Sequence, residues 1–469
     1  MSDISMKPLW EASQLLASHE LSPVELEEEC RKNAERLNDK LLAFCTPTPD
    51  IAREQAEKAE AEILAGGQKN ALHGIPYGVK DMFYTKGVRT TAGSRFLEDF
   101  IPDYSATTVQ RCEDSGAVLM GKTNTHEWAF ACNTRSFFGE SRNPYDPERT
   151  PGGSSGGSAI AVATGMAYMA LGTDTGGSIR TPASMCGVVG FKPTYGLTSQ
   201  YGVVPLSYSL DHIGCITRSV MDAALVMDRI TGYDPNDPCP ARSEGAPTQF
   251  AAALQNVHDL KGKIVGVPEN FFQDKLDYEV ERLYKAALRQ LEELGAELRP
   301  ICIPGVESFP PMAARIMFAD AAHYHRERMV GNMAGFGPIE QQRFRQGAAW
   351  SGVELIDAMR VRDQVKRAFA EAAREVDVVA VATNPVTAPL IGAAETPCCG
   401  EMEPTGDIVV RHTRLGTFAG IPAMSIPMGL TAEGMPSGLM LMSRAGRDID
   451  VLSAGWAYEQ NFPFAFRKF

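Results

Sequence analysis

The segment from about residue 71 to about residue 240 is built of short apolar and β-branched runs, each interrupted by glycine. GIPYGVK, GAVLMGKTN, AYMALGTDTGG and GVVGFKP all have this form, which is typical of short buried strands. Further along, GKIVGVPEN (262–270), ELRPICI, VDVVAVATNP (376–385) and PAMSIPMG (422–429) also read as strands, with a charged helical run ending near Leu294. We therefore expect strands from both halves of the chain in one sheet.

Helical patterns flank these strands. Residues 7–68 carry helical spacing, with Ser22 as an N-cap and Pro23 at the first helical position, and helical patterns also fill roughly 310–374. No linker, charge block or repeat divides the chain. The sequence predicts an α/β fold with a large central mixed β-sheet covered by helices on both faces. We expect one domain over 1–469, with an N-terminal helical layer at 1–70, a core at 71–240 and the remainder at 241–469.

The composition argues against several classes of function. Lys and Arg total 45 against 58 Asp and Glu, a formal net charge of −13, which disfavours attraction to nucleic acid or anionic lipid. No run reaches the ~18 apolar residues of a membrane span, and no secretory signal pattern is visible, so we expect a cytoplasmic protein. The ten cysteines form no C-x-x-C pair, which indicates reduced thiols and no metal site.

GAVLMGKT (116–123) matches the P-loop pattern G-x-x-x-x-G-K-[ST], so nucleotide binding is one alternative. A phosphate cradle needs a flexible loop after a strand. Here Ala117, Val118, Leu119 and Met120 themselves read as the strand. This geometry argues against the alternative.

PGGSSGGS (151–158) contains G-x-S-x-G centred on Ser154 and again on Ser155, the pattern of an α/β-hydrolase nucleophile elbow. Asp377 and His412 follow in the chain order that such a triad requires. An elbow follows a strand, however, whereas the preceding NPYDPERTPGG reads as a loop because of its prolines. An elbow and a plain flexible turn both remain as alternatives.

GTDTGGSIR (172–180) places two glycines directly before Ser178. The preceding AYMALGTD reads as a strand that delivers this serine to a loop. Glycines let a backbone approach a ligand closely, and the successive amides at 175–178 can form a concavity for negative charge. Such a concavity suits the oxyanion of an acyl transfer, so Ser178 is a candidate nucleophile.

A serine nucleophile needs a base that takes its proton. None of the eight histidines lies in a recognisable triad context. In HGIPYGVKDMF, by contrast, Lys80 follows an apolar strand-like run. A lysine held among apolar neighbours loses hydration and can become neutral, so Lys80 is a candidate base.

Taken together, HGIPYGVKD, TPGGSSGGS and GTDTGGSIRTPASMCGVVGFKPTYG closely resemble the amidase signature family, whose members hydrolyse or transfer amides through a Ser-cisSer-Lys triad. The resemblance is continuous from about His73 to Tyr233 and weaker over nearly the whole chain. It implies the amidase signature fold and a catalytic triad of Lys80, Ser154 and Ser178, in which Ser178 accepts the acyl group, Lys80 is the general base and Ser154 is the bridging cis serine.

The same resemblance assigns further roles. It implies that backbone amides form the oxyanion hole, and that Ser155 supports the site through hydrogen bonds. The oxyanion-hole residues are Thr175, Gly176, Gly177 and Ser178. No metal and no organic cofactor is implied.

The family includes free-standing amidases and the glutaminase subunit of an aminoacyl-tRNA amidotransferase complex. That glutaminase typically carries a YDG-x-RYG-like stretch that helps to hold glutamine, but the corresponding region here reads AAHYHRERMVGNMAGFG. The chain therefore resembles the free-standing amidases more closely. We expect hydrolysis of a carboxylic amide C–N bond through a covalent acyl-serine, and the alternative is the glutaminase of an amidotransferase complex.

Substrate specificity must come from outside the signature core. The candidates are the helices at 310–350 and the side chains of Met82, Phe83, Phe130 and Cys132. In VVRHTRLG, Arg411, His412 and Arg414 would either bind an acidic group of the substrate or be solvated charges at a helix start. We expect a small-molecule amide as the binding partner, no direct contact with nucleic acid and no membrane, and the sequence leaves a homodimer open.

Overall fold

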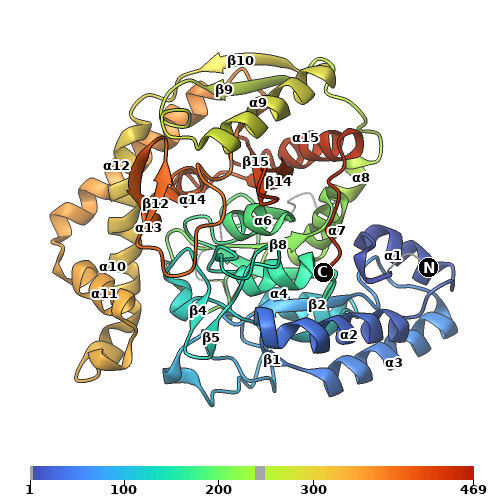
Figure 1. Cartoon of the computed structure of the whole chain (residues 1–469). Coiled ribbons are helices and arrows are strands. Elements are labelled where there is room, and N and C mark those ends of the chain that lie inside the picture. Colours follow the sequence, from blue (N-terminus) through green and yellow to red (C-terminus); the bar gives the residue numbers. More distant parts are fainter. Residues whose placement is uncertain (1–3, 238–248) are drawn as a thin grey trace.

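An 11-stranded β-sheet runs through the molecule with the strand order β1-β3-β2-β6-β8-β7-β14-β15-β11-β9-β10 (Figure 1). The computed structural model describes residues 4–237 and 249–469. The strands of this sheet are β1 (Phe44–Pro47), β2 (Pro76–Lys80), β3 (Val118–Thr123), β6 (Met169–Asp174), β7 (Val189–Lys192), β8 (His212–Thr217), β9 (Ile264–Pro268), β10 (Glu297–Ile301), β11 (Val378–Ala382), β14 (Ala423–Leu430) and β15 (Pro436–Met442). Two hairpins lie outside it, β4 (Arg135–Ser136) with β5 (Gly139–Glu140), and β12 (Glu395–Cys398) with β13 (Glu401–Pro404).

The sheet is mixed and joins both halves of the chain. β2 runs parallel to β3 and β6, and β9 runs parallel to β10 and β11. The remaining neighbours are antiparallel, including β14 with β7, the pair that connects the two halves. The expectation that strands from both halves share one sheet is confirmed.

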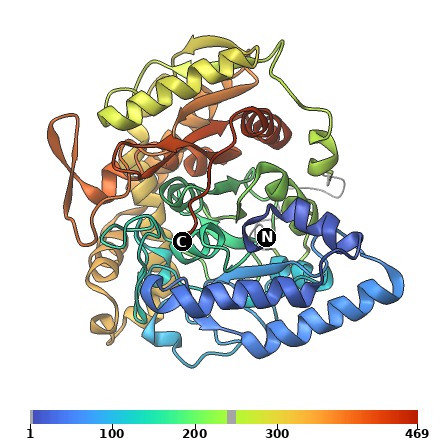
Figure 2. The same cartoon turned by 45° about the vertical axis from the view of Figure 1, so that its right-hand side comes forward.

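Helices cover both faces of the sheet (Figures 1 and 2), so the predicted α/β fold is confirmed. The first seven α-helices are α1 (Leu9–Ala17), α2 (Pro23–Leu41), α3 (Pro49–Gly66), α4 (Thr107–Asp114), α5 (Gly156–Ala163), α6 (Arg180–Cys186) and α7 (Val220–Ile230). They are followed by α8 (Phe250–Leu254), α9 (Tyr278–Glu293), α10 (Phe309–Met329), α11 (Pro338–Ala349), α12 (Gly352–Ala372), α13 (Thr405–Ile408), α14 (Thr413–Phe418) and α15 (Asp448–Asn461). Within the described residues, no helix has the length and apolar character to cross a lipid bilayer.

The N-terminal helices form a layer beside the β1, β3 and β2 edge of the sheet (Figure 1). The Ser22 hydroxyl accepts from the amide of Glu25, whose carboxylate accepts from the amide of Ser22 in return, with Pro23 in the first helical position. This capping box satisfies amides that the start of a helix leaves without partners, and it confirms the predicted N-cap. Close to the other end of α2, Arg36 donates to the carbonyl of Phe469 at 2.6 Å, so the C-terminal tail returns to this layer.

The segments that surround the candidate nucleophile come from distant parts of the sequence. β2 and β6 are adjacent, parallel and buried along their whole length. β2 ends at Lys80, and β6 ends at Asp174 directly before the glycine loop. The helices α10, α11 and α12 pack together on one side of the molecule, where α10 also contacts α14 (Figure 1). α10 and α11 contribute to the wall of the cavity described below.

Candidate active site

Lys80 lies at the end of β2 with its side chain fully buried. Its Nζ donates to the hydroxyl of Ser154 at 2.7 Å and to the hydroxyl of Thr173 at 2.7 Å. Burial lowers the pKa of Lys80 to about 7, although the carboxylates of Asp211 and Asp174 act in the opposite direction. At neutral pH a large fraction of this amine is therefore unprotonated and can accept a proton.

Ser154 and Ser155 lie in the loop that precedes α5, and both are fully buried. The peptide bond between Gly153 and Ser154 is cis. Ser155 donates from its amide to the carbonyl of Ser178 at 3.1 Å and from its hydroxyl to the carbonyl of Thr173 at 3.2 Å. The loop at 151–155 is thereby attached to both ends of the segment that carries Ser178.

Asp174 organises the glycine loop, a role that the sequence did not reveal. Its buried carboxylate accepts from the amides of Gly177 at 2.7 Å and Ile179 at 3.2 Å, and from the Arg180 guanidinium at 2.9 Å through both Nε and Nη2. Burial opposes ionisation of Asp174, but the attraction and hydrogen bonds of Arg180 outweigh it and hold the pKa at about 2. Asp174 is therefore a fixed anion that shapes the turn before and after Ser178.

The structure separates Gly177 from the other expected oxyanion donors. The Gly177 amide is bonded to Asp174, and Gly177 does not line the cavity onto which Ser178 opens. Its φ is +129°, and a Cβ there would lie 2.1 Å from the Thr413 hydroxyl. Glycine is thus required at 177 by backbone conformation and packing. Within the described residues no acceptor is bonded to the amides of Gly176 or Ser178.

Ser178 opens onto a cavity of about 40 Å³, here called the inner cavity. Thr175 and Gly176 line it together with Phe130, Cys132 and Met317. Two arginines, Arg343 from α11 and Arg414 from α14, also line it. The inner cavity is therefore a small, partly apolar space with cationic groups on one side.

The two arginines of the inner cavity differ in their partners. Arg343 packs over the rings of Phe130 at 5.4 Å and Phe318 at 5.2 Å and donates to the carbonyl of Phe130. Burial lowers the pKa of Arg343, and the nearby charge of Arg414 adds to this effect. No carboxylate among the described residues lies within 4 Å of Arg343, whereas Arg414 pairs with Asp407 at 3.3 Å.

The expected specificity residues fall into three groups. Phe130, Cys132 and Arg414 line the inner cavity, as do Met317 and Arg343 from the helices expected at 310–350. Met82 and Phe83 do not line it, and both are fully buried in the core. Arg411 does not line it either: it lies with its guanidinium 3.9 Å from the centre of the Phe271 ring and donates to the carbonyl of Phe271.

The P-loop pattern does not form a phosphate-binding loop. Residues 118–123 are the buried strand β3, as the sequence pattern indicates. The Lys122 ammonium is fully buried and donates to the carbonyl of Phe83 at 2.5 Å and the hydroxyl of Thr90 at 2.7 Å. It also lies 3.5 Å from the Asp81 carboxylate. The Lys122 ammonium is therefore occupied by partners within the core.

The residues of the elbow alternative are not assembled. The loop at 151–155 does not directly follow a strand. Asp377 interacts with Lys263 at 3.1 Å and with the amide of Ile264 at 2.9 Å. His412 is buried with Nδ1 2.8 Å from the carbonyl of Ala382, and burial lowers its pKa to about 3. His412 is therefore neither the partner of Asp377 nor a solvated charge.

No disulfide bond joins the cysteines among the described residues, which exclude Cys239. Burial raises the pKa of Cys132, so its thiol is less acidic than a free one even though it lines the inner cavity. A thiol in this state is a weak nucleophile. Cys132 is therefore a wall residue of the cavity and not a competitor of Ser178.

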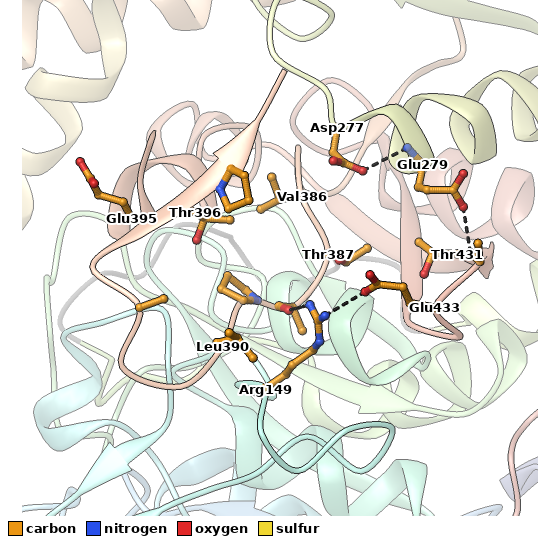
Figure 3. Close-up of a pocket in the computed structure, with 15 residues that line it drawn as sticks. Arg149, Asp277, Glu279, Val386, Thr387, Leu390, Glu395, Thr396, Thr431 and Glu433 are labelled. Carbon is orange, nitrogen blue, oxygen red and sulfur yellow. Dashed lines mark hydrogen bonds and ion pairs between the residues drawn. The ribbon is translucent and has the colours of Figure 1, made fainter. Parts of the chain in front are cut away.

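A larger cavity of about 520 Å³ lies away from this site (Figure 3). Arg149 extends across it to Glu433 at 2.8 Å, with Asp277 and Glu279 on the opposite rim. None of Lys80, Ser154 and Ser178 lines it. This cavity therefore lacks the hydrogen-bonded Lys-Ser arrangement of the candidate site.

A profile of the family described as Amidase matches residues 25–452. The chain belongs to the amidase signature family. It is 38% identical over 98% of its length to a glutamyl-tRNA(Gln) amidotransferase chain of Cyanothece sp. (strain PCC 7425 / ATCC 29141), of which it covers 98%. It is 36% identical to the corresponding amidotransferase chain of Geobacter sp. (strain M21), with 98% of each chain covered.

Solved structures extend the comparison of this amidase. A chain in the inhibitor-bound vestigial protein complex linked to the origins of an s-triazine catabolic enzyme matches with a TM-score of 0.93 and 30% identity, covering 99% of this chain and 100% of that one. A bacterial aryl acylamidase of the amidase signature family matches with a TM-score of 0.88 and 29% identity, covering 98% and 96%. The predicted family is confirmed, and the chain is an enzyme that acts on amide C–N bonds.

Proposed function

We propose that the chain hydrolyses small carboxylic amides through an acyl-enzyme on Ser178. Neutral Lys80 accepts a proton from Ser154 while Ser154 accepts the proton of Ser178, and the Ser178 oxygen attacks the amide carbon. Amides of the glycine loop stabilise the oxyanion. When the C–N bond breaks, Ser154 gives a proton to the leaving nitrogen and regains one from Lys80. Water then attacks the acyl-serine and releases the carboxylic acid.

The hydrogen bond between Lys80 and Ser154 carries this proposal. A buried amine with a pKa of about 7, placed 2.7 Å from a serine hydroxyl, is matched in proton affinity to general-base work near neutral pH. Thr175, Gly176 and Ser178 line the inner cavity and are the proposed source of oxyanion donors. We do not assign this role to the Gly177 amide, because it already donates to Asp174. We assign to Ser155 the role of supporting the site, because its hydrogen bonds connect the loop at 151–155 to the segment that carries Ser178.

We further propose that the substrate carries an acidic group close to the reacting amide. Arg343 lines the inner cavity without a carboxylate partner in the described part of the chain, and Arg414 stands beside it. An arginine is suited to planar, bidentate binding of a carboxylate. A volume of about 40 Å³ is far below the ~300–1,000 Å³ of typical drug-sized ligand sites, so only a small part of the substrate enters the inner cavity.

The test combines a substrate panel with trapping of the acyl-enzyme. Aliphatic, aryl and carboxylated amides, with glutamine included, are incubated with the purified protein, and released amine is measured. Hydroxylamine should divert the acyl group to a hydroxamate in the wild type. Ser178→Ala should remove both products while circular dichroism and the melting temperature remain those of the wild type. Full turnover by Ser178→Ala would eliminate the proposed nucleophile.

A second candidate function is the glutaminase component of an amidotransferase complex. It is favoured by the 38% identity over 98% of the chain to a relative described as a glutamyl-tRNA(Gln) amidotransferase chain. The stretch AAHYHRERMVGNMAGFG, which lacks a YDG-x-RYG-like motif, weighs against it. A glutaminase assay on the chain alone separates the two: the amidase function predicts turnover of carboxylated amides without other chains, whereas the amidotransferase function predicts glutaminase activity that requires partner chains.

A further inference from the structure

A second cavity lies directly beside the inner cavity and shares Arg414 with it. This outer cavity has a volume of about 550 Å³. Its wall is formed by α10, the end of α11, β13, α13, the start of α14 and the segments next to them. Arg414 lines both spaces and therefore lies between the cavity at Ser178 and the outer cavity.

The outer cavity carries an excess of positive charge. Lys275, Arg315, Arg411 and Arg414 line it, against the carboxylates of Glu403 and Asp407. Four cations against two anions leave a surplus in a chain whose formal net charge is −13. Asp274, 3.8 Å from Arg411, reduces the surplus but does not remove it. Such a local field attracts anions and repels cations.

Two of these cations have unused hydrogen-bond donors. The Nε atoms of Arg315 and Arg411 are buried and have no acceptor among the described residues. Arg315 has no carboxylate within 4 Å in that part of the chain, and its guanidinium lies 5.6 Å from the Trp350 ring centre and donates to the carbonyl of Glu354. A buried donor without an acceptor is costly, so both guanidinium groups retain hydrogen-bonding capacity that the described part of the protein does not use.

We propose that the outer cavity is a subsite for a second carboxylate of the substrate, held by Arg315 and Arg411 at a distance from the reacting amide. The substrate class is then an extended amide with one acidic group near the reacting bond and another several bonds away. This inference rests on the proposed amidase function for the identity of the reacting bond. Binding of a carboxylate in the outer cavity does not depend on that function.

Kinetics with matched amides test the subsite. Three amides share one reacting bond: the first has no distal charge, the second has a distal carboxylate on the acyl chain, and the third has it on the amine. We expect Arg315→Gln and Arg411→Gln each to raise KM for one of the two charged amides roughly tenfold, with little change for the uncharged amide and in kcat. The affected amide identifies which side of the substrate occupies the outer cavity. Equal effects on charged and uncharged amides, or no effect on any, would overturn the proposal.

The matched control is Arg289→Gln, an exposed arginine on α9 that lies outside both cavities. It should leave all three amides unchanged. The melting temperature of each variant is measured in parallel. If Arg411→Gln loses stability because Arg411 also packs on Phe271, Arg315→Gln carries the test.

Equilibrium binding separates this inference from the proposed function. Isothermal titration calorimetry measures the binding of tricarballylate to the whole chain at low and high salt. This tricarboxylate is too bulky for the inner cavity. We expect binding that weakens with salt, weakens roughly tenfold in Arg315→Gln and Arg411→Gln, and is unchanged in Arg289→Gln. No binding to the wild type, or equal binding to all four proteins, would refute the subsite. Binding without turnover of any amide would refute the hydrolase proposal alone.

Discussion

The hydroxyl of Thr175 donates a hydrogen bond of 2.5 Å to the carboxylate of Asp211, which ties the start of the glycine loop to the segment before β8. Asp211 also accepts from the amides of Leu206 at 2.9 Å and Ser207 at 3.1 Å. Burial raises the pKa of Asp211 to about 7. This carboxyl group therefore titrates in the same pH range as Lys80, on which its negative charge acts directly.

The first prediction concerns Asp211→Asn. Wild-type activity should fall below about pH 7, because Lys80 is then protonated and cannot accept a proton. Removing the negative charge of Asp211 should lower the pKa of Lys80, so the acid limb of the kcat/KM profile should move to lower pH. We also expect kcat to fall up to about a hundredfold because Thr175 loses its anchor. The exposed Asp357→Asn is the control; an unmoved acid limb in Asp211→Asn would contradict the electrostatic role.

The second prediction concerns the other hydrogen bond of Lys80. Thr173→Val keeps the side-chain shape but removes the hydroxyl that accepts from Nζ at 2.7 Å. The amine then has one fixed acceptor instead of two, and we expect kcat to fall roughly ten- to a hundredfold with KM nearly unchanged. Thr173→Ser restores a hydroxyl and should recover most of the loss. Equal defects in the valine and serine variants would show that packing, and not the hydrogen bond, matters at 173.

The third prediction concerns stability at low pH. The pKa of Asp174 is about 2 in the folded state and ~3.9 in an unfolded chain. Because the folded pKa is the lower one, this stabilisation is present above about pH 4 and is lost as pH falls toward 2. Asp174→Asn should lower the free energy of unfolding at pH 7 by about 3–5 kcal/mol, since it leaves Arg180 buried without its anion. Urea unfolding measures this. Glu281→Gln, which removes an exposed i,i+4 pair with Lys285, should cost under about 1 kcal/mol.

The fourth prediction concerns stability at higher pH. Burial raises the pKa of Glu459 to about 8, and its carboxyl accepts from the Ser219 hydroxyl at 2.5 Å and the Val220 amide at 2.9 Å. Because the folded pKa is the higher one, the stabilisation that Glu459 contributes is fully present below about pH 4.3, the pKa of an unfolded glutamate. This stabilisation is lost as pH rises through about 8. Glu459→Gln should therefore flatten the decline of unfolding free energy between these pH values. An unchanged slope would show that Glu459 is ionised at little cost.

Much of the sheet could be predicted from local sequence patterns. The short apolar runs at 76–80, 169–174, 264–268 and 378–382 are all strands, because buried strands need apolar and β-branched side chains over a few residues. The order of the strands could not be predicted in the same way. β7 lies between β8 and β14, which begins over 200 positions further along the chain. Such pairing depends on complementary surfaces that no single segment reveals.

The same distinction between local patterns and long-range contacts applies to the candidate site. Lys80, Ser154 and Ser178 stand in short motifs and could be selected from the sequence. Asp211 reaches Thr175 across 36 positions, and Thr413 reaches the carbonyl of Gly176 across 237. These contacts exist only after the sheet has formed. Arg343 gave no signal of its own, because one arginine in a polar helix resembles any solvated charge.

The parallel pairing of β2 with β6 has a consequence for how this gene can change. Val79 is paired with Leu171, so the ends of the two strands, and with them Lys80 and the segment leading to Ser178, are held at the strand spacing of ~4.8 Å. Inserting or deleting one codon within either strand would turn every following side chain to the opposite face. Such indels should inactivate the protein, whereas connections between strands that carry no residue of the site remain free to vary in length.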